Sequence, residues 1–353
     1  MRIAFVVGCM EANGESTFLA RANEEYAGDS ELIGFLNRKV LKNYRLDYPI
    51  TWLRYTDPSH CADYLNKFDL IWFANAGFPG EKQPTFHSIF AKIKRPVILA
   101  LFAADLERVF PFILQTVQFS CVVGYVYSRE SVREYYKDKI PQKGSIVNDI
   151  NFVIPETYDR SAKRDLLVWT SRIGTRKKFG NFMACLPHID PSIEVQIWGG
   201  VEGNILMFLG KEGYELFTKL YRGSYDHTML QDIYREAKFS VDFANVKEEG
   251  GAVQEGYEQA MVEALQYGTL PIVTENYSAG RTLPVIPMRM LEKHPRIVGE
   301  QIARIFRENI YDQMVDKARQ RVREYYIKED GWTKLFDFFN VMSEWNTVGR
   351  RPI

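Results

Sequence analysis

The sequence predicts an α/β protein with two consecutive domains, each built around a parallel β-sheet. The chain has 353 residues, which is enough for two separate hydrophobic cores. Short apolar runs rich in β-branched and aromatic residues alternate with helix-like segments along most of the chain. One stretch, Pro141–Arg164, includes Pro155 and lacks a clear period, so we expect it to link the domains. The predicted domains are residues 1–155 and residues 156–330.

Composition and charge exclude several classes of protein. Apolar residues make up 46% and charged residues 25% of the chain, and no apolar run approaches the length of a membrane span, so we expect a soluble protein without a signal peptide. The four cysteines lie far apart with no Cys-x-x-Cys, which favours a reduced, cytoplasmic protein. Five scattered histidines offer no metal-ligand spacing. The net charge of zero gives no general preference for nucleic acid, which would need a local basic patch.

The first domain is predicted from five apolar runs separated by helix-like segments. The runs expected to form strands are Ile3–Val7, Ile50–Leu53, Leu70–Ala74, Val97–Phe102 and Cys121–Tyr127. The helix-like segments lie near Ala62–Asn66, Thr85–Ile93, Leu106–Val117 and Ser131–Lys137. Strands that alternate with helices in this way form a parallel sheet covered on both faces, and ligands then bind outside the carboxyl ends of the strands.

Two segments of the first domain follow such strand ends. The loop after the first strand carries Gly8, Met10, Asn13 and Gly14, and its glycine spacing fits neither a phosphate-binding P-loop nor a dinucleotide fingerprint. From spacing alone it is an ordinary turn between a strand and a helix. Asp105 lies just after the fourth predicted strand.

The second domain repeats the alternation of strands and helices. The runs expected to form its strands are Leu166–Thr170, Glu194–Trp198, Phe239–Phe243 and Leu270–Val273. Helices are expected over Asn181–Leu186, over Leu230–Ala237 and between Glu255 and Glu263. The tail Val298–Trp345 is helical by its period and rich in aromatic residues.

The stretch Val253–Val273 combines paired carboxylates with a helix and a strand. Glu255 and Glu263 are eight residues apart, a little over two helical turns, so both carboxylates can face the same way. With a helix that starts near Gly256, Glu255 lies at the positive end, and one glutamate at each end can hold a polar ligand. The alternative from spacing alone is an ordinary amphipathic helix with solvated glutamates.

A basic loop follows the first strand of the second domain. Arg172 and Lys177 lie five residues apart in it, and Lys178 comes next. Cations at the mouth of a sheet suit a diphosphate, and they stabilise the negative charge that develops on a leaving nucleotide. The alternative is a solvated basic loop. Gly251 lies in a glycine-bearing segment, which either lets backbone amides approach a sugar or phosphate or forms a surface turn.

These segments resemble the retaining GT-B glycosyltransferases. Glu-Gly-aromatic at Glu255–Tyr257, Glu-Ala eight residues after the first Glu, and a following Gly-x-x-Pro-Ile-Val look like the E-x7-E segment of that family. The resemblance implies two Rossmann-like domains that face each other across a cleft lined by the loop after the first strand. It also implies that the last helix, at residues 331–353, crosses back onto the first domain.

The resemblance implies how the second domain binds a sugar donor. In that family the first Glu contacts the transferred sugar and the second binds the ribose hydroxyls, roles that would fall to Glu255 and Glu263. Gly251, Gly256 and Tyr257 would lie beside the donor.

The same resemblance implies how the donor's diphosphate and base are held. Arg172 and Lys177 would bind the diphosphate, with Lys178 sharing the role of Lys177, and Arg222 lies in the segment that approaches the nucleobase. No Asp-x-Asp occurs in the sequence, which agrees with positive side chains taking the place of a divalent cation. We expect no metal and no cofactor apart from the UDP-sugar donor substrate.

Three segments are similar, more narrowly, to phage DNA α-glucosyltransferases, namely Trp169–Phe179, Tyr221–Gly223 and Glu263–Pro271. Those enzymes move glucose from UDP-glucose to 5-hydroxymethylcytosine in DNA. The similarity is weak in the first domain, where Ala104-Asp105 stands in place of the His-Asp pair of that family. Asp105 is either the base that accepts the proton of the acceptor hydroxyl or a helix N-cap, and the missing histidine leaves the acceptor open.

The predicted function is transfer of a sugar, with retention, from a UDP-sugar to a hydroxymethylated pyrimidine in phage DNA, in the host cytoplasm. The basic stretches that would follow DNA phosphates, if they are not simply solvated helix faces, are Arg160–Lys178, Arg281–Arg296 and Arg304–Arg323. A base inside a duplex would have to flip out to be reached. Two alternatives stay open: the same chemistry on a saccharide or small molecule, and a non-catalytic protein that binds nucleotide-sugars or nucleic acid. The sequence decides neither the sugar nor the oligomeric state.

Overall fold

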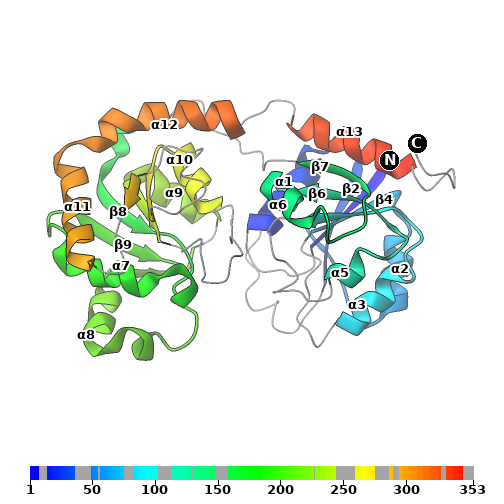
Figure 1. Ribbon diagram of the computed structural model, residues 1–353, viewed down its shortest axis with the longest axis horizontal. Helices are drawn as coiled ribbons and strands as arrows, with labels where there is room; N and C mark the ends of the chain where they lie inside the picture. Colours follow the sequence, from blue (N-terminus) through cyan, green and yellow to red (C-terminus); the bar gives the residue numbers. More distant parts are fainter. Residues whose placement is uncertain are drawn as a thin grey trace. The chain divides into compact units, whose positions relative to one another are not determined.

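The computed structural model divides the chain into two compact units (Figure 1). Unit 1 comprises residues 1–151 and 329–353, and unit 2 comprises residues 152–328. The structure describes residues 1–7, 14–35, 49–54, 56–74, 83–101, 113–128, 130–147, 158–225, 227–243, 259–274, 286–288, 294–326 and 331–344. In sequence, unit 2 is thus an insertion between two parts of unit 1.

Unit 1 is built around a seven-stranded parallel sheet with the order β3-β2-β1-β4-β5-β6-β7. Its strands are β1 (Arg2–Val7), β2 (Asp29–Phe35), β3 (Thr51–Leu53), β4 (Leu70–Ala74), β5 (Val97–Leu101), β6 (Val122–Tyr127) and β7 (Gly144–Val147). The central strands are apolar throughout because helices cover both faces of a parallel sheet. The strand order reverses between β1 and β4, and sheets of this kind bind ligands at such a point.

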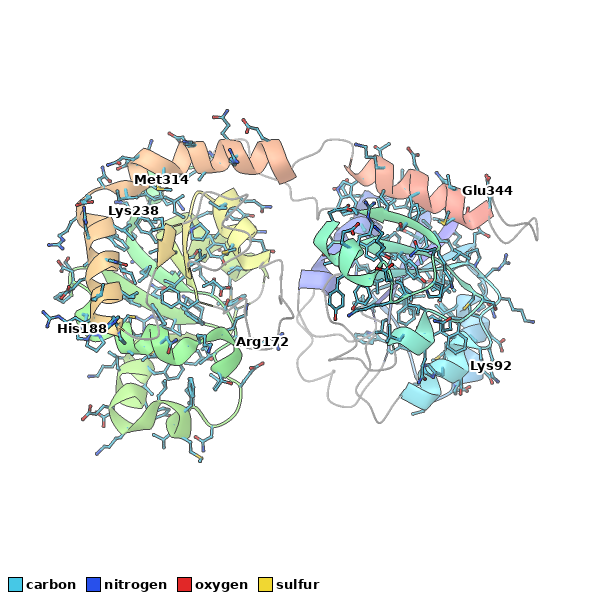
Figure 2. The ribbon with its side chains drawn as sticks, in the orientation of Figure 1. Lys92, Arg172, His188, Lys238, Met314 and Glu344 are labelled. Carbon is cyan, nitrogen blue, oxygen red and sulfur yellow. The ribbon has the colours of Figure 1, made fainter. Side chains whose placement is uncertain are left out.

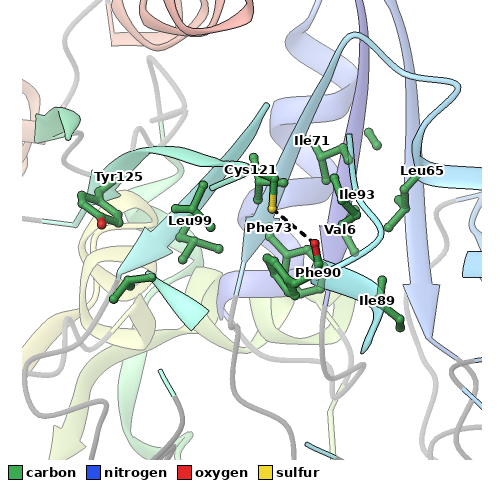
Figure 3. Close-up of a cluster of buried hydrophobic side chains, with 14 of the residues drawn as sticks. Val6, Leu65, Ile71, Phe73, Ile89, Phe90, Ile93, Leu99, Cys121 and Tyr125 are labelled. Carbon is green, nitrogen blue, oxygen red and sulfur yellow. Dashed lines mark hydrogen bonds between the residues drawn. The ribbon is translucent and has the colours of Figure 1, made fainter. Parts of the chain in front are cut away.

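The helices of unit 1 pack their apolar sides on this sheet. Those within the described residues are α1 (Gly14–Glu25), α2 (Pro58–Leu65), α3 (Gln83–Phe90), α5 (Ile113–Thr116) and α6 (Glu130–Tyr136). Figure 3 shows the core beneath α3, where the rings of Phe73 and Phe90 lie 5.2 Å apart. The Cys121 thiol donates to the Phe90 carbonyl oxygen at 3.5 Å, which ties the end of α3 to the segment that leads into β6.

The last described helix, α13 (Gly331–Glu344), packs on the sheet of unit 1 (Figure 1). The ring of Phe339 lies 5.0 Å from that of Trp72 and 6.5 Å from that of Phe5, and both partners belong to central strands. Gly144 permits the close approach, since a Cβ there would lie 2.5 Å from a methionine sulfur of α13. The prediction that a C-terminal helix returns to the first domain is confirmed.

Unit 2 contains a six-stranded parallel sheet with the order β10-β9-β8-β11-β12-β13. Its strands are β8 (Arg164–Trp169), β9 (Glu194–Trp198), β10 (Tyr221–Gly223), β11 (Ala237–Asp242), β12 (Leu270–Thr274) and β13 (Ile286–Met288). The order reverses between β8 and β11, so their carboxyl ends mark the expected ligand site of this unit.

The helical segments described in unit 2 surround the sheet. They are η3 (Arg160–Ala162), η4 (Thr175–Lys177), α7 (Phe179–Cys185), η5 (Leu186–His188), α8 (Ile205–Leu220), α9 (His227–Glu236), α10 (Gln259–Gln266), α11 (Pro295–Arg307) and α12 (Ile310–Tyr326). On one face of the sheet, Trp169 stacks on Phe182 of α7 with ring centroids 5.2 Å apart. On the other, Tyr234 of α9 and Ala264 of α10 pack with the buried residues of β8.

Several expectations about individual elements need correction. The predicted linker Pro141–Arg164 is wrong in part, because it contains β7, η3 and the first residue of β8. The strands β2, β7, β10 and β13 and the helix α8 were not predicted. Most of these strands lie toward the sheet edges and are short or mixed in polarity, so their apolar runs are too weak to stand out.

Lys163 joins three elements of unit 2 at the amino ends of its strands. Its ammonium group donates to the carbonyl oxygens of Tyr234, at 2.6 Å, and Ala237, at 2.9 Å, and to the Thr269 hydroxyl, at 3.1 Å. These acceptors lie near the end of α9, at the start of β11 and just before β12. Burial, together with the nearby Arg319 charge, lowers the pKa of Lys163 to about 7.

Replacing Lys163 by methionine should change how the stability of the protein depends on pH. The folded-state pKa lies below that of a free lysine, so the unfolded chain binds more protons between about pH 7 and pH 10. The contribution of Lys163 to stability is therefore smallest below pH 7 and grows as the pH rises through that interval. We expect the wild-type protein to gain up to about 1.4 kcal/mol per pH unit relative to Lys163→Met.

Urea denaturation of both proteins at a series of pH values measures this difference. Near pH 10 the variant should be less stable by about 2 kcal/mol, because the carbonyl groups of Tyr234 and Ala237 lose the Lys163 donor and must share the single hydroxyl hydrogen of Thr269. Lys238→Met is a suitable control for magnitude, since its ion-pair partner Asp165 is 62% exposed and stays in contact with water, so the change should cost less than about 1 kcal/mol. A difference between wild type and Lys163→Met that stays constant with pH would contradict the argument.

Candidate active site

Most of the predicted donor residues that the structure describes lie at the carboxyl ends of the strands of unit 2 or just beyond them. Arg172, Lys177 and Lys178 follow β8, Arg222 lies in β10, and Glu263 lies on α10. Figure 2 shows Arg172 and Lys238 on opposite sides of unit 2, as expected for residues near opposite ends of adjacent parallel strands. The basic residues that follow β8 therefore lie beside the switch point between β8 and β11.

Lys177 and a carboxylate that was not predicted, Asp242, form an ion pair at this point. Lys177 Nζ lies 3.5 Å from Asp242 Oδ2, and the side chains are 20% and 4% exposed. The Ser171 hydroxyl also donates to Asp242 Oδ2, at 3.3 Å. The alternative of a fully solvated basic loop does not hold for Lys177, because most of its side chain is covered.

Arg172 differs from Lys177 in being exposed. Its Nη1 donates to Glu202 Oε1 at 3.0 Å, and its side chain remains 59% exposed. The position suits binding of a ligand from solvent. Lys178 has a left-handed backbone, with φ of 55°, where η4 passes into α7, and its side chain is partly covered.

Backbone hydrogen bonds join the loops that follow β8 and β9 to each other and to the end of β10. Ile173 N donates to Gly200 O, and Gly199 N donates to Gly223 O, each at 2.9 Å. Gly199 has φ of 141°, and a Cβ there would lie 2.2 Å from Ser171 O. Only glycine can be accommodated where the backbone at residue 199 approaches Ser171 this closely. Gly199 therefore determines the position of Ser171, at the start of the basic loop.

Arg222 lies at the edge of this group of loops. Its side chain is exposed, and Nη1 donates to the Lys219 carbonyl oxygen at 3.1 Å, near the end of α8. The neighbouring Tyr221 hydroxyl donates to Gly199 O at 3.0 Å. The segment expected to approach a nucleobase is thus attached to the same loops as the basic residues.

Glu263 is buried, with 6% of its surface exposed, so the alternative of a solvated glutamate does not apply to it. It lies near Tyr234, whose hydroxyl shares a 2.7 Å hydrogen bond with Thr170 Oγ1. Burial raises the pKa of Tyr234 well above its usual value, and the charges of Tyr225, Glu263 and Asp242 add to the effect. Glu263 and Asp242 are both buried carboxylates of unit 2, and both raise the pKa of Tyr234.

The structure describes one further predicted residue, Gly14. It belongs to the first domain and begins α1. The other predicted residues lie outside the described residues, namely Gly8, Met10, Asn13, Asp105, Gly251, Glu255, Gly256 and Tyr257.

Asp242, Ser171 and Tyr234 are the polar residues that sequence reasoning missed. A signal existed for Asp242, because it is a charged residue near the end of the apolar run Phe239–Phe243. A charge in a buried parallel strand needs a compensating partner, which points to a site at that end.

The described residues contain no group of three or more His, Cys, Asp or Glu side chains arranged to hold a metal ion. Within the same part of the chain, no helix is both long and apolar enough to cross a membrane.

Comparison with known proteins finds solved structures with a similar fold, but no matching family model and no matching curated protein. The fold is similar to that of Anabaena HepE in complex with UDP and glucose, with a TM-score of 0.70 and 10% identity over 97% of this chain and 100% of that one. It is also similar to an α-glucosyltransferase, AGT, in complex with UDP, with a TM-score of 0.69 and 13% identity over 96% and 100% of the two chains.

A third solved structure that is similar to this chain contains DNA as well as UDP. It is an α-glucosyltransferase in complex with UDP and a 13-mer DNA containing a central A:G mismatch, and it matches with a TM-score of 0.66 and 12% identity over 96% of this chain and 99% of that one. These likenesses confirm the predicted GT-B fold and, at the level of fold, the resemblance to α-glucosyltransferases.

Proposed function

We propose that the protein is a retaining glycosyltransferase that moves a sugar from a UDP-sugar to a hydroxymethylated pyrimidine in DNA. The observation that carries the proposal is the buried ion pair of Lys177 and Asp242 near the ends of β8 and β11, where a doubly wound sheet binds its ligand. A fold shared with structures that hold UDP supports it.

In this proposal unit 2 binds the donor. Glu263 accepts hydrogen bonds from the ribose hydroxyls, and Arg172, Lys177 and Lys178 contact the diphosphate. The bond between the anomeric carbon and the diphosphate oxygen breaks with its electron pair on UDP, so the positive charges act where negative charge develops. The donor also lies near Arg222, and no metal or other cofactor is required.

The remaining roles fall on residues outside the described part of the chain and follow from the resemblance. Glu255 contacts the transferred sugar, with Gly251, Gly256 and Tyr257 beside it. The acceptor hydroxyl attacks the anomeric carbon from the face that UDP leaves, which retains the configuration. Asp105 accepts the hydroxyl proton.

Two classes of molecule are candidates for the acceptor of the sugar. Likeness to an α-glucosyltransferase bound to DNA favours a base in DNA, which must leave the helix stack to be reached. Likeness to HepE with UDP and glucose favours a saccharide or small molecule with the same donor chemistry. The protein would act on DNA in the cytoplasm of the cell that contains it.

Mass analysis of nucleosides tests both acceptors directly. DNA containing 5-hydroxymethylcytosine or 5-hydroxymethyluracil is incubated with the protein and a panel of UDP-sugars, then digested to nucleosides. We expect a mass increase of one sugar residue, lost with Glu255→Ala and with Glu263→Gln. Asp165→Asn, which changes an exposed carboxylate near the amino end of β8, should leave the modification intact.

Other outcomes of this experiment would redirect the proposal. UDP release on addition of saccharides, with unmodified DNA, would favour the second acceptor class. UDP binding without turnover, unchanged by Glu255→Ala, would show a non-catalytic binding protein and contradict the proposed enzyme.

A further inference from the structure

Asp242 ends β11, in the middle of the sheet of unit 2, and its side chain is 4% exposed. A carboxylate in such a place costs free energy unless charge and hydrogen-bond donors compensate for lost water. Ser171 and Lys177 both approach Asp242 Oδ2, at 3.3 Å and 3.5 Å. A single buried oxygen therefore contacts the loop after β8 both near its start and close to the point where it enters α7.

The backbone limits where the Lys177 side chain can go. Lys177 ends η4, and the left-handed conformation of Lys178 turns the chain directly into α7. Phe179, the first residue of α7, is fully buried against Trp169, with ring centroids 5.0 Å apart. Because 20% of the Lys177 side chain stays exposed, it can contact Asp242 and still meet a ligand.

We infer that Asp242 is a positioning residue for the diphosphate site, which holds the Lys177 ammonium group at the strand ends for the phosphate oxygens of the donor. The inference rests on the proposed function and adds a residue to it. The negative charge of Asp242 repels a diphosphate when taken alone. Asp242 can therefore favour donor binding only through the groups that it positions, and of its two contacts in this loop Lys177 is the cation. Experiments on Lys177 can separate this effect from others.

Titration of the purified protein with UDP and with uridine tests the inference. Asp242→Asn keeps the shape of the side chain and removes its charge. We expect the Kd for UDP to rise about tenfold, while the Kd for uridine stays unchanged because uridine lacks phosphate. Asp242→Glu, which restores the charge, should recover most of the affinity for UDP.

A matched control comes from the opposite end of the same strands. Asp165 also pairs with a lysine, Lys238, at 2.7 Å, but its side chain is 62% exposed. Asp165→Asn should leave the Kd values for UDP and uridine at their wild-type levels.

A double-mutant cycle distinguishes positioning from general support of the fold. If Asp242 acts through Lys177, then Asp242→Asn should have no further effect on UDP binding in a Lys177→Met background. Additive losses would overturn the inference, as would equal losses for UDP and uridine or unchanged UDP affinity in Asp242→Asn. Failure of both the Asn and Glu variants to fold would assign Asp242 to stability and also overturn it. A wild-type protein that binds no UDP would contradict the proposed function itself.

Discussion

Replacing Lys177 by methionine should lower the kcat of sugar transfer by about 10²–10³-fold, the usual effect of removing one group that stabilises developing charge. Lys177 is placed for this role by its contact with Asp242, and it is partly covered, so its charge is screened less than that of a surface lysine. The same substitution removes the cation that pairs with the buried Asp242 carboxylate. The free energy of unfolding should therefore fall by about 3 kcal/mol.

Arg172→Met provides the comparison that separates the two effects. Arg172 carries the same charge, but its pair with Glu202 is exposed, at 59% and 41% of the two side chains. We expect a similar loss of kcat with less than about 1 kcal/mol lost in stability. Steady-state kinetics and urea denaturation of the two variants measure these quantities. Wild-type kcat in both variants would show that the basic loop does not bind the donor.

Replacing Gly199 by alanine should damage both stability and donor binding. The φ of 141° is unfavourable for any side chain, and the new Cβ would lie 2.2 Å from the Ser171 carbonyl oxygen, so backbone must move. We expect a loss of about 3–4 kcal/mol in the free energy of unfolding, at the high end of single substitutions. The displaced segment is the start of the basic loop, so the Kd for UDP should rise as well.

Gly200→Ala is the matched control for this variant. A Cβ at Gly200 would meet nothing within 4 Å, and its backbone is not in the left-handed region. Its stability and UDP affinity should stay close to wild type. Thermal unfolding monitored by circular dichroism, with UDP titration, distinguishes the two glycines, and equal behaviour of both variants would refute the steric argument.

Most of the strands that could be predicted from the sequence are those with a long, uninterrupted apolar run. Long apolar runs such as Leu70–Ala74 and Val97–Phe102 correspond to β4 and β5, because a strand buried on both faces must be apolar throughout. The strand β2 has polar residues at Asp29, Ser30 and Glu31, so its run is too short to recognise. The short edge strand β10 forms through contacts with β9, which no local pattern reveals.

The candidate site was predictable only in part, for a related reason. Charged residues in a loop, such as Arg172 and Lys177, can be found from their position after an apolar run. Contacts between segments far apart in sequence cannot be found in this way. Asp242 meets Ser171 across 71 residues, and this contact depends on β11 lying beside β8. Residue patterns within one segment do not contain that information.

The position of α13 has a consequence for how the chain folds as it is synthesised. The sheet of unit 1 is encoded by the first part of the chain, yet Phe5 and Trp72 are covered by a helix that follows all of unit 2. During synthesis α13 cannot cover these aromatic rings until residues 331–344 have left the ribosome. All of unit 2 has been synthesised before that point. In a nascent or truncated chain that lacks α13, the apolar surface around Phe5 and Trp72 is therefore exposed and is an expected binding site for a chaperone.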